Sequence, residues 1–275
     1  MVTYVDAGAR TRRAPGVIPL HGQEAFAGMR KAGKLAAQAL DMLGEHVRPG
    51  VTTGELDRLA FEFGRDHNAI PATLFYRGYR HSICTSINHV ICHGIPGERV
   101  LREGDIVNID LTYIVDGWHG DTSRMYPVGQ ISRKAERLIR VTYESLKRGI
   151  AAAIPGNTTG DIGAAIQKYA EGERCSIVRD FVGHGLGRLF HDEPNITHFG
   201  IAGEGAEIKP GMIFTIEPMI NLGRPHAKIL NDGWTAVTRD RTLSAQCEHS
   251  IGITQTGNEV FTASPANIFN PLAQS

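Results

Sequence analysis

Two pairs of similar segments recur in this chain at almost the same spacing. RPGVTTGELDRLAFEF, from Arg48, matches IPGNTTGDIGAAIQKY, and this places Thr158 opposite Thr52, 106 residues later. LREGDIVNIDL matches IKPGMIFTIEP, and this places Gly211 opposite Gly104, 107 residues later. Self-similarity at one period indicates that a structural unit occurs twice. The chain is therefore expected to fold as two related halves.

Each half has the same order of expected elements. Apolar residues at three- and four-residue steps in 25–47 and 135–154 predict a helix before each PG turn. Each TTG triplet precedes an acidic residue and a second periodic run, as at a capped helix start. Alternating apolar residues in 105–115 and 212–222 predict strands. We expect an α+β fold in which two pseudo-symmetric halves form one antiparallel-rich sheet, with helices on one side and a functional cleft between the halves.

The limits of the repeat predict the domain organisation. An N-terminal tail is expected over residues 1–21, with Arg10, Arg12 and Arg13 in solvent. A single domain follows over 22–275. Its halves span about 22–130 and 131–262, and a short C-terminal tail follows them.

The repeat also pairs two carboxylates. It sets Asp110 against Glu217, each inside an apolar run where an unpaired carboxylate costs several kcal/mol. Asp116-Gly117 predicts a hairpin that brings Asp121 close to Asp110, and Gly120 is expected to supply a bulge that re-aims Asp121.

A fourth carboxylate, Glu248, lies on another apolar, β-prone run, LSAQCEHSIGIT. Four gathered carboxylates repel one another unless cations neutralise them. Two divalent cations, with His184 as a neutral nitrogen ligand, would neutralise the set, and paired metals of this kind catalyse hydrolysis. The sequence thus predicts a dinuclear site with five ligands: Asp110, Asp121, His184, Glu217 and Glu248.

FVGHGLGRLFHDEP contains two histidines, His184 and His191, seven positions apart. On a helix this step is about 10.5 Å of rise, too long for one ion, and on a strand it puts the rings on opposite faces. One histidine is expected on the metal and the other facing a substrate. The glycines at 183, 185 and 187 argue against regular structure and favour a close backbone approach at a site.

Composition excludes several other classes of function. Lys plus Arg and Asp plus Glu number 29 each, so no net basic charge draws the chain to nucleic acid or a membrane surface. The four cysteines form no CxxC pair, which favours reduced thiols in a cytoplasmic protein. No apolar run approaches the roughly 20 residues of a membrane span, and no signal peptide is recognised.

Together, these motifs resemble those of the type I methionine aminopeptidases. The similarity runs from about residue 22 to 262 and includes CTSINHVICHGIP, GDIVNIDLT, DGWHGDTSRMY, GHGLGRLFHDEP, KPGMIFTIEPM and LSAQCEHSI in the family order. It implies the pita-bread metallopeptidase fold and removal of the initiator methionine from nascent polypeptides with a small second residue. Attack by a hydroxide activated by two metals (Co, Mn, Fe or Zn) is the implied chemistry.

The resemblance also implies roles for individual residues. Asp110, Asp121 and Glu248 would hold one metal, and Asp121, Glu248, His184 and Glu217 the other. Three residues would be catalytic: His191 on the scissile carbonyl, His93 on the scissile amide, and Glu217 as a proton shuttle. The implied methionine pocket contains Tyr76, Tyr79, Cys84, Phe190 and Trp234, and the implied site for Na or K contains Asn88, Val90 and Ser244.

The chain departs from the family pattern near the implied substrate entrance. It has YRHS at 79–82 where the family often has FPKS, and His89 where an acid is usual. The alternatives are the proline-specific branch of the same fold and a binding protein that has lost catalysis. Nascent N-termini are the implied partners, with ribosome contact possible through the co-translational role, and a monomer is expected.

Overall fold

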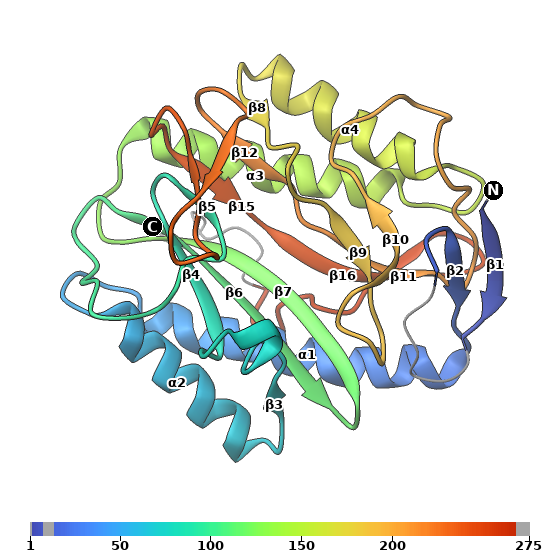
Figure 1. The fold of residues 1–275 in the computed structure, drawn as a ribbon, viewed down its shortest axis with the longest axis horizontal. Coiled ribbons are helices and arrows are strands. Elements are labelled where there is room, and N and C mark those ends of the chain that lie inside the picture. The colour runs from blue at the N-terminus through green and yellow to red at the C-terminus, as the bar shows by residue number, and fades with distance from the viewer. Residues whose placement is uncertain (1, 8–13, 268–275) are drawn as a thin grey trace.

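The computed structural model describes residues 2–7 and 14–267. Four helices form two pairs, α1 (Gln23–His46) with α2 (Thr53–Asp66) and α3 (Arg133–Ala152) with α4 (Thr159–Gly172). In the view of Figure 1, α1 and α2 lie below the strands, and α3 and α4 lie above them. None of the helices in the described part has the length and apolar character that a membrane-spanning helix needs.

Local sequence explains where α2 and α4 begin. Thr52 accepts a hydrogen bond from Glu55 N at 3.1 Å, and Thr158 forms a capping box with Asp161. Both threonines also form an isolated bridge, Thr52 with Val100 and Thr158 with Glu207. The two halves therefore repeat the same local arrangement, as the 106-residue offset predicts.

The central sheet has nine strands, and its described pairings are antiparallel. Its order is β10-β9-β11-β16-β7-β6-β3, with β17 beside β16 and β4 beside β6. The strands are β3 (Ile70–Pro71), β4 (Ile83–Ile87), β6 (Ile106–Val115), β7 (Trp118–Pro127), β9 (Gly183–Gly185), β10 (Asp192–Ile196), β11 (Ile213–Ile216), β16 (Glu248–Ile253) and β17 (Asn258–Val260).

Smaller sheets surround the central one. A three-stranded sheet contains β8 (Ser176–Ile177), β12 (Met219–Asn221) and β15 (Ser244–Gln246), and a second contains β5 (Val90–Cys92), β13 (Ala227–Ile229) and β14 (Ala236–Thr238). The strand expected over 212–222 is therefore two strands in different sheets. The chain passes from β11 to β12 at Glu217-Pro218, where proline has no N–H to continue a ladder.

Part of the segment expected to be a tail has regular structure. Within residues 1–21, β1 (Thr3–Asp6) and β2 (Val17–Leu20) form a parallel pair, and the Tyr4 hydroxyl donates to Glu207 O at 2.7 Å. The interpretation of Arg10, Arg12 and Arg13 concerns residues outside those described. At the other end, the Ser264 hydroxyl donates to Asp41 at 2.8 Å, so the described part of the C-terminal segment is tied to α1.

Successive side chains on the central strands point to opposite faces of the sheet, one toward the core under the helices and the other toward the site. On β7, a Cβ at Gly120 would lie 2.3 Å from Ala32 of α1, so this face packs on the helix and the neighbouring Asp121 points away from it. The register between β6 and β7 runs without a shift from Ile106 to Trp118. The bulge expected at Gly120 is therefore wrong: glycine is needed there because the helix backbone passes so close.

Candidate metal centre

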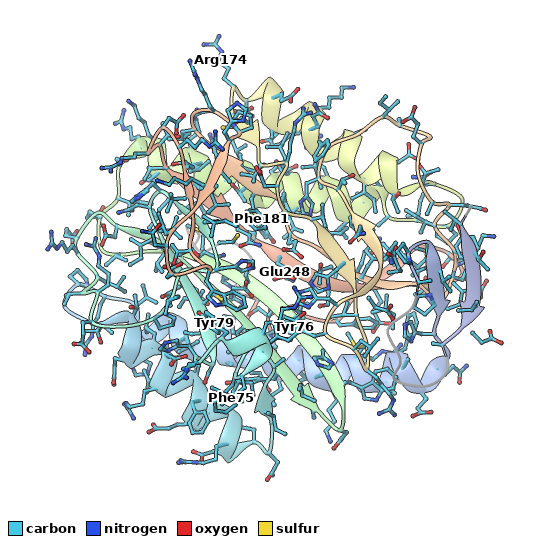
Figure 2. All side chains as sticks on the ribbon, in the orientation of Figure 1. Phe75, Tyr76, Tyr79, Arg174, Phe181 and Glu248 are labelled. Carbon is cyan, nitrogen blue, oxygen red and sulfur yellow. The ribbon has the colours of Figure 1, made fainter. Side chains whose placement is uncertain are left out.

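One cavity of about 540 Å³ collects the residues that the sequence analysis selected for metal and substrate. Figure 2 shows side chains labelled there, Tyr76, Tyr79, Phe181 and Glu248, gathered over the middle of the molecule. The five expected ligands line this cavity together with His93, His191, Tyr76, Tyr79, Cys84, Phe190 and Trp234.

The two aspartates come from the β6–β7 hairpin. Asp116 and Gly117 at its turn have φ of 51° and 80°, as a two-residue hairpin turn requires. Asp110 pairs with Ser123 and Thr112 pairs with Asp121, so the aspartates are diagonal neighbours on one face. The Thr112 hydroxyl donates to Asp121 Oδ1 at 2.6 Å and fixes that carboxylate.

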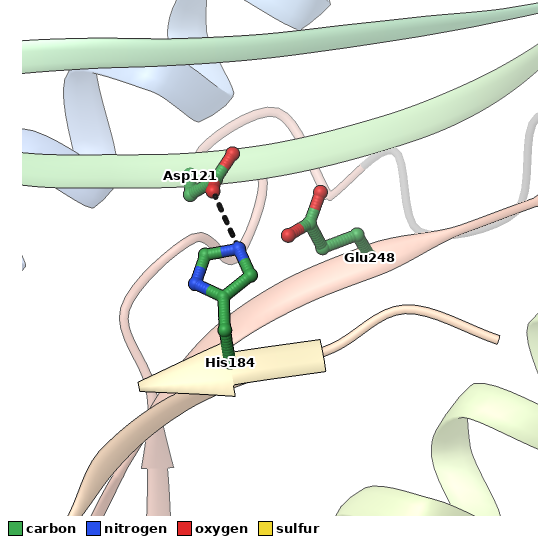
Figure 3. Close-up of side chains that lie close together, drawn as sticks. All are labelled: Asp121, His184 and Glu248. Atoms are coloured by element: carbon green, nitrogen blue, oxygen red, sulfur yellow. Dashed lines mark ion pairs between the residues drawn. The ribbon is translucent and has the colours of Figure 1, made fainter. Parts of the chain in front are cut away.

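His184, Asp121 and Glu248 form the tightest group, with one potential ligand atom from each lying within 4.8 Å of the others. Figure 3 shows these side chains converging from three neighbouring parts of the sheet. His184 Nε2 lies 3.6 Å from Asp121 Oδ2 and 3.7 Å from Glu217 Oε1. Its Nδ1 donates to Gly185 O at 3.1 Å, and this tautomer leaves Nε2 free to act as a ligand.

The strand that carries His184 is pressed between two others. A Cβ at Gly183 would lie 2.5 Å from Thr215 O of β11, and one at Gly185 would lie 2.0 Å from Glu193 O of β10. Only glycine fits at these positions, so the expected close backbone approach is present. The expectation that the glycines argue against regular structure is wrong. Residues 183–185 form the short strand β9, which pairs with both β10 and β11.

Thr215 links two of the candidate ligands. Its hydroxyl accepts from His184 N at 3.0 Å and donates to Glu217 Oε1 at 2.7 Å. Gln246 Nε2 donates to the other oxygen of Glu217 at 3.2 Å. The carboxylate of Glu217 is therefore oriented from both sides before any ligand binds.

Burial governs the electrostatics of the centre. Burial raises the pKa of Asp110 to about 7, and burial together with repulsion from neighbouring carboxylates raises the pKa values of Asp121, Glu217 and Glu248 well above normal. No lysine or arginine in the described residues contributes to these shifts. Burial lowers the pKa of His184 to about 4, so it is neutral near pH 7. A donor set of four carboxylates and one neutral imidazole, lacking a protein counter-charge, fits divalent cations.

These shifts predict how pH affects the metal-free protein. As pH rises above about 6.5, the native state still holds protons on carboxyls that the unfolded chain has released, on Asp110 up to its pKa of about 7 and on Asp121, Glu217 and Glu248 beyond it, so the stability of the metal-free protein falls. Histidines that are buried in the neutral form make stability rise with pH, but only below about pH 6.5, where the histidines of the unfolded chain are protonated. We expect the Tm difference between metal-loaded and metal-free protein to widen by several degrees over this range, as measured by calorimetry. A constant difference would mean that these carboxyls hold no extra protons without metal.

The segment that forms one wall of the cavity is anchored to α2. Asp57 Oδ1 accepts from Ser82 N at 2.7 Å and from Ile83 N at 3.2 Å, and Asp57 Oδ2 lies 3.1 Å from His81 Nδ1. Asp57 could not be identified from the sequence, because its partners lie 24–26 residues away on another element. Several further lining residues were also not predicted: Thr73, Arg77, Asp180, Phe181, Val182, Met219 and Gly233. For Phe181 and Met219, the sequence did offer a signal, since Phe181 lies just before the GHG motif and Met219 follows the EP motif.

Comparison with known proteins settles the family. The model described as Metallopeptidase family M24 matches residues 27–255. The chain belongs to metallopeptidase family M24. This M24 chain is 55% identical over 256 residues to the methionine aminopeptidase of Rickettsia prowazekii, covering 92% of this chain and 98% of that protein. It is 50% identical over 236 residues to the methionine aminopeptidase of Escherichia coli K12, covering 85% of this chain and 89% of that protein.

Solved structures confirm the fold of this M24 metallopeptidase. The crystal structure of the Rickettsia prowazekii methionine aminopeptidase matches with a TM-score of 0.88 over 89% of this chain and 99% of that one. The prolidase from Pyrococcus horikoshii matches with a TM-score of 0.70 at 18% identity, over 88% of this chain and 63% of that one, and this shows the shared fold alone. The expected pita-bread fold and the resemblance to methionine aminopeptidases are both confirmed.

Proposed function

We propose that this protein removes the N-terminal methionine from nascent polypeptides whose second residue is small. The observation that supports this most is that one cavity is lined jointly by five potential metal ligands, two further histidines and a group of aromatic side chains. Relatives that are 50–56% identical over most of the chain carry the name methionine aminopeptidase. Nothing in the composition favours nucleic acid as a partner, since the formal net charge is zero.

The proposed cofactor is a pair of divalent metal ions, with Co, Mn, Fe and Zn as candidates. Asp110, Asp121 and Glu248 would hold one ion, and Asp121, Glu248, His184 and Glu217 the other. When bound, such a pair activates a water molecule and polarises the substrate carbonyl. The oxygen-rich donor set with one nitrogen suits Mn, Fe or Co better than a purely structural zinc.

Three residues of the cavity are proposed to handle protons and the developing charge. Glu217, oriented by Thr215 and Gln246, would take the proton of the attacking water and pass it on. His191 would donate a hydrogen bond to the scissile carbonyl, a contact that stabilises the oxyanion. Desolvation, followed by the neighbouring His184 and Arg77, lowers the pKa of His191, and burial lowers that of His93. Neutral imidazoles at these positions suit hydrogen bonding to the scissile carbonyl and amide.

The methionine side chain is proposed to enter an aromatic pocket. Tyr76 and Phe190 pack edge to face with ring centroids 5.0 Å apart, and so do Tyr79 and Trp234 at the same separation. Cys84 lies beside them, with a thiol whose pKa burial raises, so it presents a neutral, polarisable surface. A thioether suits such a pocket because sulfur makes favourable contacts with ring edges.

A monovalent cation, Na or K, is proposed near Asn88, Val90 and Ser244. Ser244 N donates to Asn88 O at 2.8 Å, so these two segments lie side by side, and the buried Ser244 hydroxyl has no partner among the described residues. We further propose that the protein works in the cytoplasm as a monomer, with nascent chains at the ribosome as its substrates.

Peptide hydrolysis by metal-stripped protein tests the proposed function. Co, Mn, Fe or Zn would be added back separately, with Met-Ala-Ser and Ala-Pro-Ser as substrates. We expect metal-dependent release of methionine from the first peptide alone. Cleavage of only the second would assign the protein to the proline-specific branch. Absence of cleavage with every metal would favour a binding protein that has lost catalysis.

A further inference from the structure

Arg77 stands out among the residues that line the cavity, because it is the one that carries a permanent positive charge. It lies in the short 3₁₀ turn η1 (Tyr76–Gly78), and it is exposed, whereas the nearby pocket residue Tyr79 is buried. Arg77 has φ of 48°, in the left-handed region that residues other than glycine rarely occupy. The turn therefore places a charged side chain on the open rim of the cavity, outside the aromatic pocket.

The guanidinium packs on the ring of Tyr76, a pocket residue that itself stacks on His191. Its central carbon lies 5.2 Å from the centroid of the Tyr76 ring, a cation–π contact. The Tyr76 ring in turn stacks on His191 with centroids 5.3 Å apart and an interplanar angle of 25°. The charge of Arg77 also contributes to lowering the pKa of His191, which agrees with this proximity. Figure 2 shows Tyr76 directed toward the centre of the site and Phe75, on its other side, directed outward.

No carboxylate of the described residues forms an ion pair with Arg77. Other exposed arginines do have such partners: Arg30 bonds Glu259 at 2.6 Å and Arg58 bonds Glu55 at 2.6 Å. Asp180 lines the same cavity, but it makes no ion pair with Arg77. The in-plane N–H donors of this guanidinium are thus available to a ligand that enters this cavity.

The positions of these groups suggest which part of a peptide reaches Arg77. In the proposed function, the methionine side chain fills the aromatic pocket and His191 contacts the scissile carbonyl, so the rest of the peptide must leave across the exposed rim. The Tyr76 ring lies 5.3 Å from the His191 ring and 5.2 Å from the guanidinium, so the distance from His191 to the guanidinium is at most that of about three extended residues. We propose that Arg77 binds an acidic side chain at the third or fourth position of the substrate, so that the enzyme prefers N-termini with negative charge there. This inference rests on the proposed function.

Peptide amides that differ in one side chain test this preference. Met-Ala-Asp-Gly amide, its Asn counterpart of nearly equal shape and its Lys counterpart would be compared by kcat/KM, and the same series would be made at the fourth position. Amidation removes the terminal carboxylate as a second anion. We expect the metal-loaded wild type to favour Asp over Asn by about fivefold at low salt, with less preference at high salt. Arg77→Ala should bring the ratio close to one, and Arg77→Glu should favour Lys.

Arg80→Ala is the matched control, because Arg80 is exposed three residues further on and does not line the cavity. We expect this variant to keep the wild-type ratio. A wild-type ratio near one at both positions would overturn the inference, and so would an equal loss of preference in Arg80→Ala, since that would indicate only a general positive field. Preference of the wild type for the Lys peptide would show that the negative charge of Asp180 outweighs the positive charge of Arg77 at the rim. That result would also overturn the inference.

Binding without turnover separates this inference from the proposed function. Trp234 lines the cavity, so quenching of its fluorescence reports peptide binding. If no peptide were cleaved, the proposed function would fail, but tighter binding of the Asp peptide in wild type than in Arg77→Ala would still support the anion site. Equal binding of the Asp and Asn peptides by wild type would overturn it.

Discussion

Asp121→Asn is expected to lower kcat/KM by about 1000-fold or more and to reduce the bound metal measured by atomic absorption. Asp121 is proposed to contact both ions, and loss of one shared carboxylate removes several kcal/mol of transition-state stabilisation. Asparagine has nearly the same shape and keeps an oxygen that accepts from Thr112. The fold should therefore survive, with the Tm of metal-free protein unchanged or raised, since a buried carboxyl has been removed.

Asp116→Asn is the matched control for this change. Asp116 lies in the same hairpin, is exposed, and pairs with Lys31 at 2.6 Å, far from the proposed metals. Its φ of 51° is one that asparagine adopts readily. Activity of this variant should be close to wild type. Full metal content and activity in Asp121→Asn would remove Asp121 from the ligand set.

Glu217→Gln is expected to lower kcat by about 100- to 10,000-fold, the range associated with general acid–base groups, with a smaller change in KM. Glutamine cannot accept and release a proton near neutral pH. It also replaces one of the oxygens that now accept from Thr215 and Gln246. Kinetics with Met-Ala-Ser at measured metal occupancy would separate loss of the proton shuttle from loss of metal.

Glu207→Gln provides the comparison for a carboxylate outside the cavity. Glu207 is exposed, with 57% of its side chain accessible, and its carboxylate lies 3.4 Å from Lys209. We expect this variant to retain wild-type kcat. Near-normal kcat in Glu217→Gln with both metals bound would rule out Glu217 as the shuttle and leave it only as a ligand.

Elements that depend on local sequence were predicted well. Apolar periodicity predicted helices over 25–47 and 135–154, and the structure has them at Gln23–His46 and Arg133–Ala152. The Asp116-Gly117 turn was also predicted, because positive φ at two successive positions favours Asp or Asn followed by Gly. These features depend on residues close in sequence, so the pattern itself carries the information.

Features that depend on distant segments were predicted less well. Alternation in 212–222 did not reveal that β11 and β12 join different sheets, since both pieces keep the same pattern. Gly120 was interpreted as a bulge, whereas its role is to admit the backbone of α1 at Ala32. A glycine has the same appearance in a sequence whether it serves a bulge or a close packing contact.

By itself, the sequence determined the two related halves, the potential ligands and the family. The tertiary structure decided how these residues meet. His249 on β16 pairs with Thr122 on β7, which sets Glu248 beside Asp121, although the two strands belong to different halves. Likewise, Asp57 reaches the cavity wall from α2, and η1 turns Arg77 onto the rim. Such placements depend on pairing and packing between segments far apart in the chain, whereas periodicity records only which face of its own element each side chain occupies.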